Sequence, residues 1–247
     1  MPTGVPGVAA VAGSQFGAVV RPAVVVEAGR YPRETPVATA PAQRHVAVAG
    51  GPRGLVVLAP GFFEYELDPN GDLRVTLLRA IGQLSRADLS TRPGHAGWPG
   101  PTPEAQCPGP DRLQLAVVPI EAGDLRAESA LPELWEDVFL PPRALWIRQA
   151  TPLAPPAWDV RLEGRGLVFS AAKPPEEGDG LVLRCWNARA ERVAGAWRLG
   201  RPVARAVRLR ADERADGAGE LAIAEGGHAV PVVVEGYGIS TVRVECL

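Results

Sequence analysis

One irregular stretch of the sequence gathers side chains that could bind a polar ligand. Residues 81–110 are rich in proline and glycine, and loops of this length inside a compact domain are usually functional or disordered. Arginine and aspartate can hydrogen-bond sugar hydroxyls, and an aromatic face can stack on a pyranose ring. The residues that could do this, in the stretch or just before it, are Arg79, Arg86, Asp88, Arg92, His95 and Trp98.

The same residues also fit a structural role. Arg86, Asp88 and Arg92 are close enough in sequence to tie the loop to itself, or to a neighbouring domain. We favour this anchoring role over direct contact with a substrate, and the length and polarity of the loop keep the second role open.

No recognisable catalytic set accompanies this cluster. Hydrolysis of a glycoside normally needs two carboxyl groups on either side of the bond. Glu64 and Glu66 alternate with apolar residues, so we interpret them as the solvent face of a strand. His45, His95 and His228 are isolated, whereas a catalytic zinc site needs about three protein ligands. The nucleophile elbow and the phosphate-binding loop are absent from the sequence as well.

The charge balance excludes some partners. The 247 residues carry 26 basic and 28 acidic side chains, for a net charge of -2. This gives no electrostatic case for binding nucleic acid or an anionic membrane. Lys173 is the only lysine, and arginine-rich composition of this kind is typical of a bacterium with a GC-rich genome.

The cysteines and the start of the chain indicate a cytoplasmic protein. Cys107, Cys185 and Cys246 are odd in number and far apart, so a disulfide framework is not expected. The first 20 residues lack the basic leader of a signal peptide, and no apolar stretch is long enough to cross a bilayer.

The hydrophobic pattern predicts an all-β fold. We expect residues 1–44 to be an extended connecting segment, with an edge strand at Ala23–Glu27. Residues 45–150 should form part of a large sandwich, with a hairpin over 62–80, the long loop 81–110 and one helix near 122–139.

Residues 151–247 should form a C-terminal β-sandwich. Apolar runs recur there at short intervals, for example at Leu181–Asn187 and Ser240–Cys246, with turn residues such as Asp216-Gly217 between them. A strand is also expected at Glu220–Ala224. Pro231 suits an edge strand, because proline cannot donate a ladder hydrogen bond.

Four segments carry a family likeness. The stretch APGFFEYEL, the stretch VTLLRAIGQLSRADLSTRPGHAGWPGPTPEAQC and the strand LAVVPI resemble the C-terminal half of family 38 glycoside hydrolases. These are α-mannosidases and relatives such as mannosylglycerate hydrolases. The segment GLVLRCWNARAERVAGAWRL is similar to the pattern of strand, arginine, aromatic residue, asparagine turn and strand in the same family.

The resemblance implies two C-terminal sandwiches, the larger of the galactose-mutarotase-like type. It also implies that zinc and the catalytic aspartates belong to an N-terminal catalytic domain whose motifs are missing here. The partners would be that α-mannosidase catalytic domain, from the same gene or a separate chain, and a mannose-containing glycan or glycoside. Arg79 and the loop Arg86–His95 are the candidates to reach the sugar pocket.

We therefore expect a supporting region of an α-mannosidase-like hydrolase, with no cofactor and no activity alone, and with an exposed apolar patch where the missing domains would dock. The alternative is a stand-alone carbohydrate-binding module that uses Trp98 with Trp135, Trp146 or Trp158 as its platform. A remnant of a broken gene that folds poorly is a third alternative.

Overall fold

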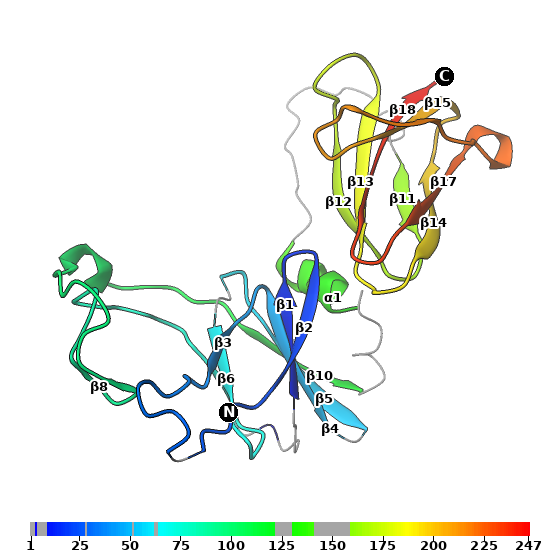
Figure 1. Ribbon diagram of the computed structural model, residues 1–247. Coiled ribbons are helices and arrows are strands. Elements are labelled where there is room, and N and C mark those ends of the chain that lie inside the picture. The colour runs from blue at the N-terminus through cyan, green and yellow to red at the C-terminus, as the bar shows by residue number, and fades with distance from the viewer. Residues whose placement is uncertain are drawn as a thin grey trace. The chain divides into compact units, whose positions relative to one another are not determined.

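The computed structural model shows two compact units, each built around antiparallel sheets (Figure 1). It describes residues 3, 9–27, 29–50, 52–61, 64–121, 130–140 and 159–247. The first unit comprises Met1–Ser14 and Val19–Arg126, and the second comprises Gln15–Ala18 and Ala127–Leu247. The predicted all-β sandwich class is confirmed.

A five-stranded sheet and a three-stranded sheet enclose the core of the first unit. The five-stranded sheet has the order β10-β5-β4-β1-β2 and the other has the order β3-β6-β7. The strands of the five-stranded sheet are β1 (Ala9–Ser14), β2 (Gly17–Pro22), β4 (His45–Gly50), β5 (Arg53–Leu58) and β10 (Ala116–Glu121). Those of the second sheet are β3 (Thr39–Pro41), β6 (Glu64–Leu67) and β7 (Leu73–Val75).

The N-terminal segment contributes strands rather than connecting chain. Ala10 of β1 lies opposite Val48 of β4, and both side chains are fully buried. Small residues fill this part of the core, so the segment lacks the alternation of large apolar residues that marks a strand in a sequence. The edge strand of this region is β2, and residues 23–27 that follow it have no regular structure.

The predicted hairpin is present but short. Leu67 pairs with Leu73, and the Asp68 carboxylate accepts the backbone N–H groups of Asn70 and Asp72 at 2.9 and 3.0 Å. This turn is confirmed, and Gly71 there has the positive φ of 87° that favours glycine. The strand after the turn ends at Val75, so the chain leaves the sheet earlier than expected.

The second unit is a sandwich of two sheets with the orders β11-β14-β17 and β12-β13-β18-β15-β16. The first sheet contains β11 (Val160–Glu163), β14 (Val193–Leu199) and β17 (Ala229–Val234). The second contains β12 (Leu167–Lys173), β13 (Leu181–Asn187), β15 (Val203–Leu209), β16 (Ala215–Glu220) and β18 (Ile239–Cys246).

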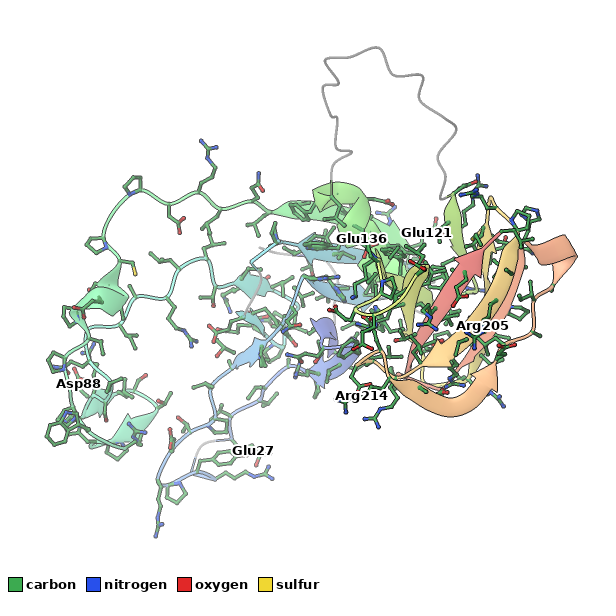
Figure 2. The ribbon with its side chains drawn as sticks, turned by 90° about the horizontal axis from the view of Figure 1, so that it is seen from above. Glu27, Asp88, Glu121, Glu136, Arg205 and Arg214 are labelled. Carbon is green, nitrogen blue, oxygen red and sulfur yellow. The ribbon has the colours of Figure 1, made fainter. Side chains whose placement is uncertain are left out.

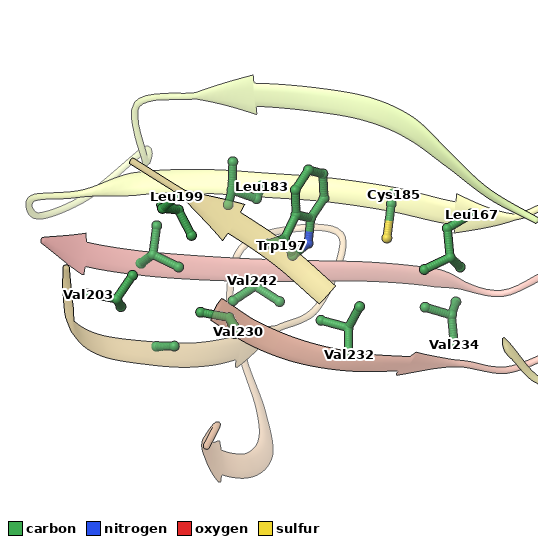
Figure 3. Close-up of a cluster of buried hydrophobic side chains, with 12 residues drawn as sticks. Leu167, Leu183, Cys185, Trp197, Leu199, Val203, Val230, Val232, Val234 and Val242 are labelled. Atoms are coloured by element: carbon green, nitrogen blue, oxygen red, sulfur yellow. The ribbon is translucent and has the colours of Figure 1, made fainter. Parts of the chain in front are cut away.

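Apolar side chains from both sheets form one core in this unit (Figure 3). Trp197 of β14 lies in its middle and is fully buried. Pro231 lies on β17, an edge strand, as predicted, and Pro119 lies on β10, an edge strand of the first unit.

Four local expectations concern the helix, one strand, one turn and the domain boundary. The helix α1 spans Ala130–Phe139, and residues 122–129 lie outside the described residues. The predicted strand at Glu220–Ala224 is wrong, because the strand spans Ala215–Glu220 instead. The turn expected at Asp216-Gly217 lies at Arg210–Arg214, closed by the hydrogen bond from the Arg210 N–H to the Arg214 carbonyl at 2.8 Å. A register shift between β15 and β16 lets glycines of positive φ sit in that strand. The predicted boundary in the proline-rich segment near 151 lies outside the described residues.

The buried Asn187 ties three backbone segments together. Its amide nitrogen donates to the carbonyls of Glu191, Val234 and Glu235 at 2.7, 3.1 and 3.1 Å, and its oxygen accepts the Arg189 N–H at 2.9 Å. Replacing Asn187 by alanine leaves buried carbonyls unsatisfied and should lower the free energy of unfolding by about 2 kcal/mol. Urea unfolding measures this loss. Asn70→Ala, in an exposed turn, is the control and should change stability by less than about 0.5 kcal/mol. An equal loss in both variants would contradict the assigned role.

Candidate functional site

The long loop forms an arm that runs out from the first unit and returns to it. We define the arm as residues 76–115, between β7 and β10. It contains the two-residue strands β8 (Asp88–Leu89) and β9 (Arg92–Pro93) and a short 3-10 helix, η1 (Pro103–Gln106). Asp88 lies at the far end of the arm (Figure 2). The tip, residues 84–98, holds all but one of the predicted site residues.

Arg86 and Asp88 form a two-pronged ion pair at the tip. The Arg86 Nε and Nη2 groups donate to the two Asp88 carboxylate oxygens at 2.8 and 2.6 Å. The Arg86 guanidinium beside Asp88 holds the pKa of that carboxyl below its usual range. Both side chains are exposed, so the pair presents donors and acceptors to any ligand that reaches the tip.

Ser85 joins the two sides of the tip. It is 7% exposed, and its Oγ accepts the backbone N–H groups of Ala96 and Gly97 at 3.2 and 3.4 Å. The same oxygen lies 3.4 Å from His95 Nδ1. Nothing in the sequence pattern marked Ser85, because its partners lie ten to twelve residues away.

Arg92 anchors the tip to the N-terminal segment. Its Nη1 lies 3.5 Å from Glu34 Oε1, and its side chain is 17% exposed. Beside it, Thr35 donates from its backbone N–H and its Oγ1 to the Thr91 carbonyl, at 2.8 and 3.1 Å. This geometry matches the anchoring role. Glu34 and Thr35 were missed, because their proline-rich surroundings were interpreted as connecting chain.

Trp98 is the exposed aromatic residue of the tip. Its side chain is 79% exposed, and that of Leu84 is 67% exposed. A Cβ atom on Gly100 would come within 2.7 Å of the indole, so a glycine there lets the ring lie close to the backbone. The tip thus combines an open aromatic face with the exposed Arg86–Asp88 pair.

Arg79 lies at the base of the arm and pairs with Glu64 of β6. Glu64 also accepts a hydrogen bond from Thr76 Oγ1 at 2.7 Å. Burial raises the pKa of Glu64, but the hydrogen bonds from Thr76 and Arg79 outweigh it, so the pKa lies below its ordinary value. Glu64 therefore stays ionised and ties the start of the arm to the sheet. The prediction that Glu64 only faces solvent is wrong, because its side chain is 13% exposed.

Replacing Glu64 by glutamine should loosen the arm. The loss of a charged hydrogen bond that solvent partly screens is worth roughly 1 kcal/mol, so we expect tryptic cleavage in the arm to become about fivefold faster. Glu66→Gln is the matched control, since Glu66 lies on the same strand but pairs with Arg74 of β7 at 2.8 Å. Equal cleavage rates in both variants would show that Glu64 does not hold the arm.

The pKa shifts of the carboxyl groups in the described residues all run in one direction. A general acid needs a raised pKa, whereas the carboxyl groups with a clearly shifted pKa all have it lowered; they are Glu64, Asp68, Asp88 and Glu213. Within the same part of the chain, no three His, Cys, Asp or Glu side chains lie together as metal ligands would. No helix among these residues has the length and apolar character to cross a bilayer.

Comparison with known proteins places this fold within longer chains. No protein-family model matches the sequence. A curated protein of Halalkalibacterium halodurans named "Putative mannosylglycerate hydrolase" is 31% identical over 150 residues, which are 60% of this chain and 15% of that protein.

Two solved structures share the fold. A glycosyl hydrolase family 38 protein from Enterococcus faecalis matches with a TM-score of 0.70 at 22% identity, over 99% of this chain and 26% of that one. An alpha-mannosidase from Enterococcus faecalis V583 matches with a TM-score of 0.71 at 22% identity, over 99% of this chain and 25% of that one. The chain thus spans about a quarter of these structures, and a smaller share of the curated relative. The resemblance to family 38 glycoside hydrolases is confirmed as a likeness to the β-sandwich part of such proteins.

Proposed function

We propose that this chain is the C-terminal β-sandwich region of an α-mannosidase-like glycoside hydrolase, and that it supports a catalytic domain without catalysing the reaction itself. The main support for this proposal is that 99% of this chain aligns with only 26% and 25% of the two solved structures.

The partners in this proposal are an α-mannosidase catalytic domain and a mannose-containing glycan or glycoside. Zinc would belong to the catalytic domain and would activate the bond for hydrolysis there. The tip of the arm would line the sugar pocket, because it carries the exposed hydrogen-bonding groups of Arg86 and Asp88 and the open face of Trp98.

We also propose a cytoplasmic location. Its support is that Cys107, Cys185 and Cys246 are all free thiols and that Cys107 is exposed. A reducing compartment preserves such thiols.

The test replaces the matching segment of the Enterococcus faecalis alpha-mannosidase with this chain. The chimera should hydrolyse 4-nitrophenyl α-mannoside in the presence of zinc, whereas this chain alone should show no turnover. Turnover by the purified chain would disprove the absence of a catalytic centre. An inactive chimera would count against the supporting role.

The tip is tested in the same chimera. Trp98→Ala should raise KM about fivefold with little change in kcat, since ring stacking is worth about 1 kcal/mol. Asp179→Asn, an exposed carboxyl in the second unit, is the control and should leave KM unchanged. An unaltered KM in Trp98→Ala would remove the tip from the sugar pocket.

The alternative is a stand-alone carbohydrate-binding module, which the exposure of Trp98 favours. Trp135 is only partly exposed, and Trp146 and Trp158 lie outside the described residues. Calorimetric titration of the chain alone with mannose oligosaccharides separates the two proposals. Heat of binding that is lost in Trp98→Ala supports the module, and no binding supports the scaffold.

A further inference from the structure

The base of the arm carries an apolar groove that the proposed function does not use. It lies between Ala59–Gly61 after β5, Val75–Leu77, and Arg112–Leu115, and its volume is about 330 Å³. Of the residues that line it, Arg112 alone is charged. We call this cavity the arm groove.

Large apolar side chains surround the arm groove without being buried. Leu77, Leu113 and Leu115 line it and are 47%, 51% and 46% exposed. Further along the arm, Leu78 and Ile81 are 63% and 45% exposed. Monomeric proteins rarely leave large contiguous apolar patches open to water, and such patches usually mark interfaces.

The backbone around the groove is open as well. Among the described residues, no backbone carbonyl accepts a hydrogen bond from an N–H group of residues 77–83 or 108–115. Arg112 instead donates to the carboxylate of its neighbour Asp111. Farther along the arm, its two sides are joined, because the N–H groups of Leu84 and Thr102 donate to the carbonyls of Gly100 and Gly82 at 2.9 Å each. Two open stretches of extended chain thus flank an apolar cavity, and this surface is longer than a small ligand can cover.

We propose that the arm groove is the docking site for the catalytic part of the α-mannosidase-like protein, which would insert a row of apolar side chains between the two sides of the arm. This inference rests on the proposed function. Two facts select this occupant. The related solved chains continue for about three times the matched length, since this chain covers only 26% and 25% of them. The lining is also apolar, which fits a folded partner better than a sugar.

The experiment compares this chain alone with the complete chimera described above. Hydrogen–deuterium exchange of residues 77–83 and 108–115 should be at least tenfold slower in the chimera. The double variant Leu77→Asp with Leu113→Asp should restore fast exchange there. The control variant Val20→Asp changes an equally apolar side chain that is 66% exposed on β2, and it should keep the protection.

The two readouts separate the two proposals. Slow exchange supports docking whether or not the chimera is active, whereas activity bears on the supporting role. An active chimera with an unprotected arm overturns the docking site and leaves the supporting role standing. Sedimentation shows whether a second copy fills the groove: a dimer of this chain that the double variant abolishes would overturn the proposal.

A second measurement does not depend on folding of the chimera. In the solved Enterococcus faecalis alpha-mannosidase, the positions that match Leu77, Leu113 and Leu115 should lose most of their exposed surface when the rest of that chain is included. Positions that stay equally exposed would overturn the proposal, and the position that matches Val20 serves as the reference.

Discussion

Replacing Trp197 by alanine is expected to lower the free energy of unfolding of the second unit by about 4 kcal/mol, the largest effect of any single substitution considered. The indole is fully buried and lies between the two sheets (Figure 3). Its ring meets Phe169 edge-on, with centroids 6.2 Å apart at 78°. Alanine would leave a cavity that rigid strands on both sides cannot close, so both transfer energy and packing are lost.

The measurement should follow the second unit by itself, because the chain forms two compact units, and a protein of more than one domain need not unfold in a single step. Hydrogen exchange of the β13 and β18 amides during urea unfolding serves this purpose. Trp98→Ala is the matched control, since it removes the same ring from a position that is 79% exposed, and it should cost less than about 0.5 kcal/mol. Comparable losses in both variants would mean that Trp197 is not the centre of the core.

The second large effect concerns pH. Burial and the neighbouring Arg44 lower the pKa of His45 from 6.5 to about 4. The ring is 3% exposed, and neither nitrogen has a hydrogen-bond partner among the described residues. The unfolded chain takes up a proton near pH 6.5 while the folded chain stays neutral until about pH 4, so the unfolded state binds more protons in between.

The stability of the first unit should therefore fall by about 3 kcal/mol as the pH drops from 7 to 4, with no further His45 contribution below that range. Urea unfolding at a series of pH values measures the fall. In His45→Phe, this part of the pH dependence should disappear, while the part due to carboxyl groups such as Asp68 remains. Identical pH profiles for the two proteins would contradict the assignment to His45.

Prediction from sequence succeeded where large apolar residues alternate. Strands were predicted at Leu181–Asn187 and Ser240–Cys246, and the structure contains both, the second as Ile239–Cys246. Prediction failed in the first 44 residues because Ala10 and Ala12 are core residues despite their small size. A pattern of small side chains is compatible with a buried strand and with a loop, and only the partner strand decides between them.

In the candidate site as well, contacts between sequence neighbours could be predicted, and contacts between distant residues could not. The ion pair of Arg86 and Asp88 joins neighbours two residues apart, so the sequence was sufficient to suggest it. The contacts of Arg92 with Glu34 and of Ser85 with His95 depend on how the chain folds back. Arg79 was grouped with the tip by sequence, but it pairs with Glu64 at the opposite end of the arm.

The prolines in two border strands limit how any neighbour can attach. Pro119 and Pro231 each occupy the interior of an edge strand, β10 and β17, where an incoming strand would need an uninterrupted row of N–H donors. Growth of either sheet by adding a strand at that border is thereby interrupted. A partner that binds at either edge strand must therefore rely on side chains and irregular segments. The same interruption protects this chain from forming fibrils through these two edges.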